Sequence, residues 1–276
     1  MSEGSPLVIA AAQSLVSSDI AANGAAIRQL IAGAATSGAR LVVFCEGALS
    51  GYAKNQIASP QSWRNYDWAG QDAELAEIGL LCGSLGIAAI VGGAHRFSDV
   101  YPPHNSLYVL DASGSLVGRY DKRFLSNTEL QSWYTPGTEP LVFDLDGYRL
   151  GCAICIESQF VEVFREYETL GVDAVLFGSY GVPEHFQIAL RAHAGLNNFW
   201  IAVATASQEA DKGVAGIIGP DGRWCARVDE GLGTGLVLGP LDRLDPAYDI
   251  ALNKARPWRA RARQGDIYRE KLPKDR

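Results

Sequence analysis

The stretch Leu150–Phe160, LGCAICIESQF, passes from small and apolar residues to polar ones at Cys155. The apolar run up to Ile154 is typical of a buried strand, and the residues after Cys155, ESQFVEVFREY, are typical of the start of a helix. The stretch therefore predicts a core strand that ends at Cys155 and leads into a helix. Because strands that alternate with helices form α/β folds, it also indicates the class of the fold.

The same alternation of strands and helices extends over the rest of the chain. We expect helices at 20–37, 73–86, 160–170 and 183–197, single strands at 7–13, 39–45, 87–93, 172–179, 199–207 and 235–241, and hairpins at 105–122, 141–155 and 214–228. No linker or change of composition divides the chain, so we predict one α/β domain over residues 1–276, with helices outside and sheets inside. The β-α-β-β order of 7–122 recurs loosely in 141–239, which suggests two similar halves.

Composition and charge argue against several classes of protein. The chain is 47% hydrophobic and carries a net charge of −7, and its basic residues gather only in a C-terminal segment at 255–276. We expect no nucleic-acid partner, and we expect this segment to be solvated or to lie at a subunit contact. No apolar run approaches the roughly eighteen residues of a membrane span, and MSEGSPLVIAAAQ lacks the regions of a signal peptide. A cytoplasmic protein without a membrane partner is the expectation.

Cys152 and Cys155 do not have the spacing of a redox or metal-binding pair on a strand. Residues three apart on a strand point to opposite faces, and their Cα atoms lie roughly 10 Å apart, beyond the roughly 7 Å that a disulfide spans. A zinc site needs a second pair of Cys or His residues, and no other pair has such spacing. We therefore predict no metal site, and we interpret most of the five cysteines as small buried residues.

Cys155 differs from the other cysteines because it lies at a strand end. A thiol at a helix N-terminus is next to a positive dipole and free N–H groups, which favour a thiolate and can hold an oxyanion. Two charged residues also follow apolar strands, Glu46 after ARLVVFC and Lys122 after LVGRYD. One such residue is usually a plain strand terminator. Together, a thiol, a carboxylate and an ammonium suffice for acyl transfer.

A cysteine–histidine pair is the competing arrangement of catalytic groups. None of the four histidines lies at a strand end with apolar residues before it. We interpret them as structural or surface residues: His95, His104, His185 and His193.

Several segments of the chain resemble the ordered motifs of the nitrilase, or carbon–nitrogen hydrolase, superfamily, and the resemblance covers nearly the whole chain. They are FCEGALSGY (44–52), GRYDKRFL (118–125), GCAICIESQFVE (151–162) and GVAGIIGPDG (213–222). The resemblance implies that Glu46, Lys122 and Cys155 are catalytic, with Cys155 as the nucleophile. It also places Glu129, in SNTELQSWYTPG, where the family has a second active-site glutamate.

Some residues depart from the family pattern outside these catalytic positions. Cys45 replaces a proline before Glu46, and Leu196 replaces a common glutamate. After the nucleophile, the chain departs from the common aromatic, aspartate, arginine and proline at Ile156, Glu157, Gln159 and Val161. Nitrilases proper have Trp and Asn where this chain has Ile156 and Ser158, which argues against a nitrilase.

The resemblance implies a four-layer αββα sandwich, usually paired into homodimers or larger homo-oligomers, and a site that uses no metal and no organic cofactor. It implies a thiol hydrolase that cleaves a non-peptide C–N bond of a small amide through a Cys155 thioester and releases ammonia or an amine. The backbone N–H of Ile156 would join Lys122 in holding the oxyanion. The alternatives are a nitrilase, an N-carbamoyl-amide hydrolase and, outside enzymes, an inactive scaffold of the same fold.

The substrate pocket is the part of the site that the sequence defines least. Five residues are candidates for its lining: Tyr52, Trp133, Ser179, Tyr180 and Asn197. Core packing is the alternative for each aromatic residue, and Tyr180 is favoured because it follows a predicted strand. The acyl group of the substrate does not follow from these residues.

Overall fold

The computed structural model describes residues 5–273, so the ends of the predicted domain and of the basic segment, 1–4 and 274–276, lie outside it. Within the described residues, twelve strands form two groups of six. The first sheet has the order β5(Leu116–Asp121), β4(His104–Leu110), β3(Ala88–His95), β2(Leu41–Val43), β1(Leu7–Ser14), β12(Gly235–Leu241). The second sheet has the order β6(Val142–Leu145), β7(Tyr148–Ile154), β8(Ala174–Gly178), β9(Trp200–Ala206), β10(Gly216–Ile218), β11(Trp224–Arg227).

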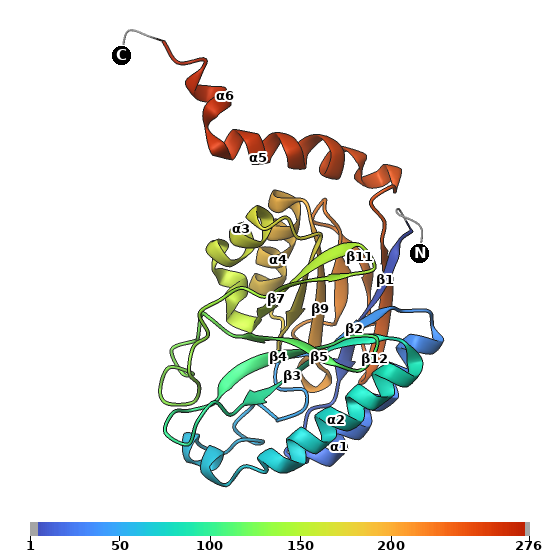
Figure 1. Ribbon diagram of the computed structural model, residues 1–276, viewed down its shortest axis with the longest axis vertical. Coiled ribbons are helices and arrows are strands. Elements are labelled where there is room, and N and C mark those ends of the chain that lie inside the picture. The colour runs from blue at the N-terminus through green and yellow to red at the C-terminus, as the bar shows by residue number, and fades with distance from the viewer. Residues whose placement is uncertain (1–4, 274–276) are drawn as a thin grey trace.

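Two helices cover the outer face of each sheet. Figure 1 shows α1(Ile20–Thr36) and α2(Trp68–Leu85) on the side of the first sheet, and α3(Val161–Thr169) and α4(Glu184–Asn197) on the side of the second. Strand residues alternate between faces. Leu176 accordingly packs in the core that includes the first sheet, whereas Val175 and Phe177 pack with α3 and α4. The predicted αββα sandwich is confirmed.

The order of the strands supports two similar halves, with one change to the predicted boundary. The three predicted hairpins are present as β4–β5, β6–β7 and β10–β11. However, β12 does not belong to the second half, because it pairs antiparallel with β1 along Leu7–Gln13. The sheets are joined where Gln13 and Ser14 pair with Thr205 and Ala206. The last strand of the chain therefore completes the first sheet.

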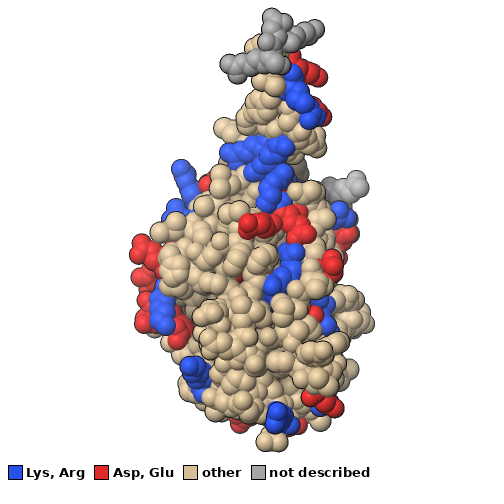
Figure 2. Space-filling model, turned by 90° about the vertical axis from the view of Figure 1, so that its left-hand side faces the viewer, with Lys and Arg blue, Asp and Glu red and all other residues tan. Residues whose placement is uncertain are grey.

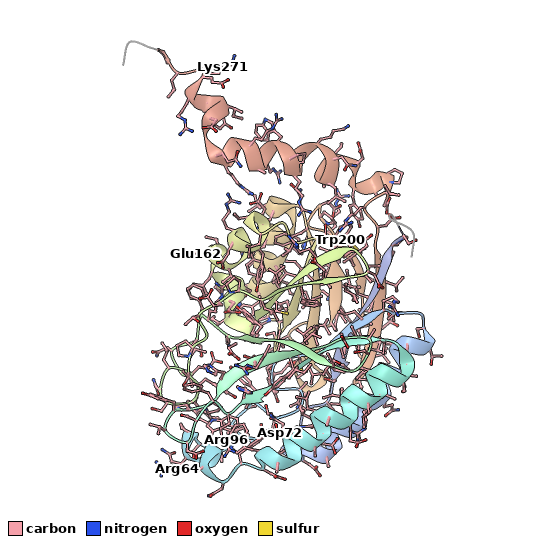
Figure 3. The ribbon with its side chains drawn as sticks, in the orientation of Figure 1. Arg64, Asp72, Arg96, Glu162, Trp200 and Lys271 are labelled. Atoms are coloured by element: carbon pink, nitrogen blue, oxygen red, sulfur yellow. The ribbon has the colours of Figure 1, made fainter. Side chains whose placement is uncertain are left out.

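The basic C-terminal segment is helical and anchored to the body. A π-helical turn over Ile250–Ala255 continues into α5(Arg256–Gln264), and α6(Asp266–Arg269) follows. These elements form an arm that extends from the body (Figures 1 and 2), and Lys271 lies far out on it (Figure 3). Arg259 and Arg263 donate to the Leu196 carbonyl near the end of α4, where helix carbonyls are partly negative. A role of the arm as a subunit contact stays a prediction.

Among the described helices, none combines the length and the apolar character that crossing a membrane requires.

A glycine lets the two sheets approach each other closely at one edge. A Cβ atom on Gly178, at the end of β8, would lie 2.9 Å from the Phe44 carbonyl oxygen and 3.2 Å from the Glu46 nitrogen. The backbone that follows β2 leaves no room for a side chain at this point. Glycine at 178 therefore allows the second sheet to lie directly against the segment that carries Glu46.

We predict that packing between the two sheets supplies much of the stability. Leu176→Ala removes a fully buried side chain from this layer, which should lower the free energy of unfolding by about 2–5 kcal/mol. Leu80→Ala, on the exposed face of α2 where Leu80 is 69% exposed, should change it by about 0.5 kcal/mol or less. Urea denaturation measures both variants, and equal losses would contradict the layered core.

Candidate active site

Four polar side chains meet at the edge of the sandwich where strands of both sheets end. Glu46 lies three residues beyond β2, Lys122 follows β5 directly, Cys155 follows β7 directly, and Glu129 lies in the loop after β5. Lys122 Nζ is 2.9 Å from Glu46 Oε1 and 2.8 Å from Glu129 Oε1. The Cys155 thiol lies close enough for the charges of all three groups to act on its pKa. The structure thus brings together the residues that the sequence singled out.

Lys122 is a buried ammonium between two carboxylates. The side chains of Lys122 and Glu46 are 0% exposed, and that of Glu129 is 4% exposed. Burial alone lowers the pKa of Lys122, but the charges of Glu46, Cys155 and Glu129 outweigh it and hold the pKa above its ordinary value. Lys122 therefore stays protonated at neutral pH, where it can donate hydrogen bonds but cannot act as a base.

Glu129 already accepts a full set of hydrogen bonds. Both of its oxygens accept from Lys122, at 2.8 and 2.9 Å. Oε1 also accepts from Asn105 Nδ2 and the Tyr52 hydroxyl, and Oε2 accepts from the Ser126 backbone N–H at 2.7 Å. Burial raises the pKa of Glu129, but Lys122 outweighs this and holds the pKa below its ordinary range. Glu129 therefore stays ionised and is poorly suited to take a proton.

Glu46 differs from Glu129 because one of its oxygens has room for a proton. Oε1 accepts from Lys122 at 2.9 Å and from Asn105 Nδ2 at 2.7 Å. Within residues 5–273, Oε2 accepts only the Tyr180 backbone N–H, at 3.2 Å. Since a carboxylate oxygen can accept two hydrogen bonds, Oε2 has one free acceptor position.

Asn105, at the start of β4, is a residue of the site that the sequence analysis missed. Its Nδ2 donates to Glu46 at 2.7 Å and to Glu129 at 3.1 Å, so one amide lies between the two carboxylates. Its backbone carbonyl also accepts from the Lys122 N–H at 2.8 Å. The only sequence signal is a buried polar residue that opens the apolar run NSLYVL.

Cys155 occupies a left-handed turn, with φ +52°, a conformation that is uncommon for a residue other than glycine. A 3₁₀ helix, Cys155–Gln159, follows, and α3 begins only at Val161. The expectation that the thiol faces the N-terminus of the long helix is therefore wrong. Burial and the charge of Glu46 raise the pKa of Cys155, and Lys122 opposes them only in part. The resting group is a thiol that needs a base, in a residue that is partly exposed.

Three of the predicted pocket residues lie beside this cluster. The Tyr52 ring centroid is 6.0 Å from Lys122 Nζ, and the Tyr180 N–H donates to Glu46. The Ser179 hydroxyl donates to the Gly181 carbonyl at 2.6 Å, and Ser179 also acts to lower the pKa of Cys155. Trp133 packs in a neighbouring aromatic cluster and reaches Glu129 only through its backbone N–H, at 3.1 Å. Contact of these residues with a substrate stays a prediction.

The structure does not bring Asn197 to the site. Asn197 lies at the end of α4, and its Nδ2 donates to the His193 carbonyl one turn earlier, at 3.0 Å. Asn197 was predicted as a candidate for the pocket lining, but in the helix its side chain is hydrogen-bonded to the helix's own backbone.

The histidines take no part in the cluster. His193 is stacked on Phe164, with ring centroids 4.0 Å apart, and its Nε2 lies 3.0 Å from the Ser158 carbonyl oxygen. All four histidines lie within residues 5–273, and none of them hydrogen-bonds to Cys155 there. The same residues contain no group of three or more His, Cys, Asp and Glu side chains that could hold a metal ion. Metal independence stays a prediction.

A row of three packed aromatic rings, those of Tyr52, Tyr134 and Trp63, begins next to Glu129. Tyr134 stacks on Tyr52 with centroids 6.3 Å apart, and Trp63 packs on Tyr134 at 5.5 Å. Beyond these rings lies a surface cavity of about 630 Å³, whose lining includes Trp63, Arg64 and Arg96. Figure 3 shows the two arginines at the lower end of the molecule. None of the four clustered residues lines this cavity.

Comparison with known proteins identifies the family of this chain. Residues 8–244 match the family model described as carbon-nitrogen hydrolase. A protein of Pseudomonas protegens described as hydrolase in pqqF 5′ region is 30% identical over 196 residues, 67% of each chain. The 2-oxoglutaramate amidase of Bacillus subtilis is 27% identical over 202 residues, 70% of this chain and 73% of that protein. The N-carbamoylputrescine amidase of Arabidopsis thaliana is 24% identical and covers 98% of this chain and 96% of its own.

Solved structures show the same fold. The amidase from Nesterenkonia sp. aligns with a TM-score of 0.75 at 23% identity, over 94% of this chain and 97% of its own. A mutant of the amidase from Nesterenkonia sp. AN1, with the acetamide moiety of fluoroacetamide added covalently at its active-site cysteine, aligns with a TM-score of 0.76 at 22% identity, over 95% and 98% of the two chains.

We predict that Asn105→Asp destabilises the protein in a pH-dependent way. The new carboxylate would face Glu46 and Glu129, and like charges together with burial raise a carboxylate pKa above its unfolded value. The resulting loss of stability is present at high pH and is relieved as the pH falls through the raised pKa. Relative to Asn105→Ala, which removes the same donor without adding charge, Asn105→Asp should be less stable at pH 8, and the difference should shrink toward pH 5. Urea denaturation at both pH values measures the difference in the free energy of unfolding between the two variants. A difference that does not change with pH would contradict the position of Asn105 between two carboxylates.

Proposed function

The chain belongs to the carbon–nitrogen hydrolase family, and we propose that it hydrolyses a small amide through a thioester on Cys155. The observation that carries the proposal is the Cys155 thiol on a left-handed turn, within the electrostatic reach of a buried Glu–Lys–Glu cluster. In this cluster Glu46 supplies a base, Lys122 supplies a fixed cation, and Glu129 holds that cation in place. These are the groups that nucleophilic acyl transfer needs.

In the acylation step, Glu46 acts as the base. Its free Oε2 position accepts the proton of Cys155, and the thiolate sulfur forms a bond to the amide carbonyl carbon. The negative charge that develops on the carbonyl oxygen is held by Lys122, which stays protonated, and by the Ile156 N–H. The first N–H groups of a helical turn have no partner within it, so the Ile156 N–H is available in the 3₁₀ helix.

The same glutamate completes the reaction. Glu46 gives its proton to the amide nitrogen, the C–N bond breaks, and ammonia or an amine leaves a Cys155 thioester. Glu46 then takes a proton from water, whose oxygen forms a bond to the thioester carbon. The C–S bond breaks, the acid leaves, and Glu46 returns the proton to the Cys155 sulfur. Glu129 is fully hydrogen-bonded and holds Lys122 in place throughout.

The substrate class proposed is small non-peptide amides. Only Cys155 of the cluster is partly exposed, while Glu46 and Lys122 are completely buried, which favours a small acyl group. The relatives support the class, since they include a 2-oxoglutaramate amidase and an omega-amidase. An N-carbamoyl amide is the second candidate, favoured by the N-carbamoylputrescine amidase that covers 98% of this chain.

Location and assembly are part of the proposal. All five cysteines are free in the structure, which suits a reducing compartment such as the cytoplasm. Exposed apolar side chains along the arm support a homo-oligomer, because a second copy of the chain would cover them. They are Ile250, Trp258, Tyr268 and Leu272. Sedimentation velocity of the whole chain and of an arm deletion would test the assembly.

We predict that Cys155→Ala abolishes ammonia release from a panel of short amides, ω-amides, carbamoyl compounds and nitriles, because no other group can form the thioester. Cys152→Ala is the matched control, since Cys152 is buried between the sheets, and its activity should be retained. The compound that responds with the wild type identifies the substrate class. Equal ammonia release by wild type and Cys155→Ala would contradict the proposal.

Loss of the base should slow the reaction without unfolding the protein. Glu46→Gln is expected to lower kcat/KM by on the order of 10²–10⁴-fold or more, the range for lost acid–base catalysis. Steady-state kinetics on the responding amide give this ratio. Full activity of Glu46→Gln would show that another group removes the thiol proton.

A further inference from the structure

We propose that Glu157 is a positioning residue that fixes Cys155 relative to Lys122. The inference rests on the proposed function, because it assigns Glu157 a part in the chemistry of these two residues. Glu157 is two residues beyond the nucleophile and is completely buried. It touches neither Glu46 nor Glu129 through a hydrogen bond in the described structure.

The Glu157 carboxylate joins the two segments that carry the lysine and the thiol. Oε2 accepts the backbone N–H of Ile154, the residue before the nucleophile, at 2.7 Å. Oε1 accepts the backbone N–H groups of Arg123 and Phe124, the two residues after Lys122, at 2.8 and 3.1 Å. One side chain thereby holds the end of β7 in the second sheet against the end of β5 in the first.

The fourth donor to Glu157 is the hydroxyl of Tyr120, which is also completely buried. Its hydroxyl donates to both carboxylate oxygens, at 2.8 and 2.9 Å. Within residues 5–273 Glu157 forms no ion pair, so the direct contacts of its carboxylate are all hydrogen bonds, and Lys122 acts on its charge only from a distance. Every contact donates to Glu157, which requires a side chain that only accepts. A glutamine would place an N–H₂ group against one of these donors.

The contacts of Glu157 also hold the left-handed turn at Cys155 in place. A residue other than glycine keeps a left-handed conformation only where its surroundings hold it, and such residues cluster at functional sites. The Glu157 side chain reaches back to the N–H of Ile154 and closes this turn on itself. Because it also holds the backbone after Lys122, loosening it would change the distance between the thiol and the ammonium.

The test compares Glu157→Gln with Glu157→Asp and with Glu168→Gln. Glu168 is a buried glutamate on α3 that pairs with Arg263 at 2.9 Å and has no contact with the cluster, so it controls for loss of a buried carboxylate. Two readouts are taken. The first is kcat per active site, with sites counted by peptide mass spectrometry of Cys155 modified by methyl methanethiosulfonate. The second is the pH dependence of that modification, which needs no amide substrate.

For Glu157→Gln we expect kcat per active site to fall on the order of 10²-fold with KM nearly unchanged. The reason is that a displacement of a catalytic group by about 1 Å can lower the rate by that factor. Burial raises the pKa of Cys155 in the wild type, and a loosened turn should move the midpoint of modification down toward the ordinary thiol value of about 8.5. Glu157→Asp should recover much of both changes, and Glu168→Gln should alter neither.

A midpoint for Glu157→Gln that equals the wild-type value would overturn the proposal, and so would an unchanged kcat per modified site. The midpoint of Cys155 modification distinguishes failure of the positioning role of Glu157 from failure of the proposed amide hydrolysis. If it falls while the wild type releases no ammonia from any amide, Glu157 still positions Cys155 and the proposed function is what fails.

Discussion

The buried contact of Lys122 with Glu46 and Glu129 is the interaction on which the rest of the structure depends. An ammonium without water around it is stable only when opposite charges and hydrogen bonds surround it. Here two carboxylates supply both, and Asn105 separates them with one amide. The contact also gives the two glutamates different chemistry. Glu129 is saturated with hydrogen bonds, whereas Glu46 keeps one position free, so only Glu46 is suited to move a proton.

The fold is the means by which these groups meet. The first sheet supplies Glu46 and Lys122, and the second supplies Cys155, so neither sheet alone carries the site. The sheets can approach because Gly178 leaves room for the backbone beside Glu46, and the Tyr180 N–H bonds across the gap to Glu46. Stability and reactivity are therefore linked, because any change that separates the sheets also separates the thiol from its base.

Much of this arrangement can be read from the sequence, and the remainder has identifiable physical reasons. Periodicity predicts the hairpins and helices, and strand ends predict Glu46, Lys122 and Cys155. The role of Asn105 depends on its contacts with Glu46 and Glu129, which lie 59 and 24 residues away in the chain and which local pattern does not encode. The 3₁₀ helix that begins at Cys155 has a composition that also suits the start of an α-helix. α4 ends at Asn197, as predicted, but the Asn197 side chain donates to the His193 carbonyl of its own helix, a contact that the sequence pattern does not encode.

The most direct test of this account is the protonation of Lys122. Its Nζ resonance can be followed by ¹⁵N NMR between pH 7 and 11, with Lys122→Arg to assign the signal. If Glu46 and Glu129 hold the ammonium as described, the signal should not titrate at the ordinary lysine value of about 10.4, because the pKa lies above it. A Lys122 that loses its proton at or below that value would show that burial outweighs the two carboxylates, and the division of roles between the glutamates would not hold.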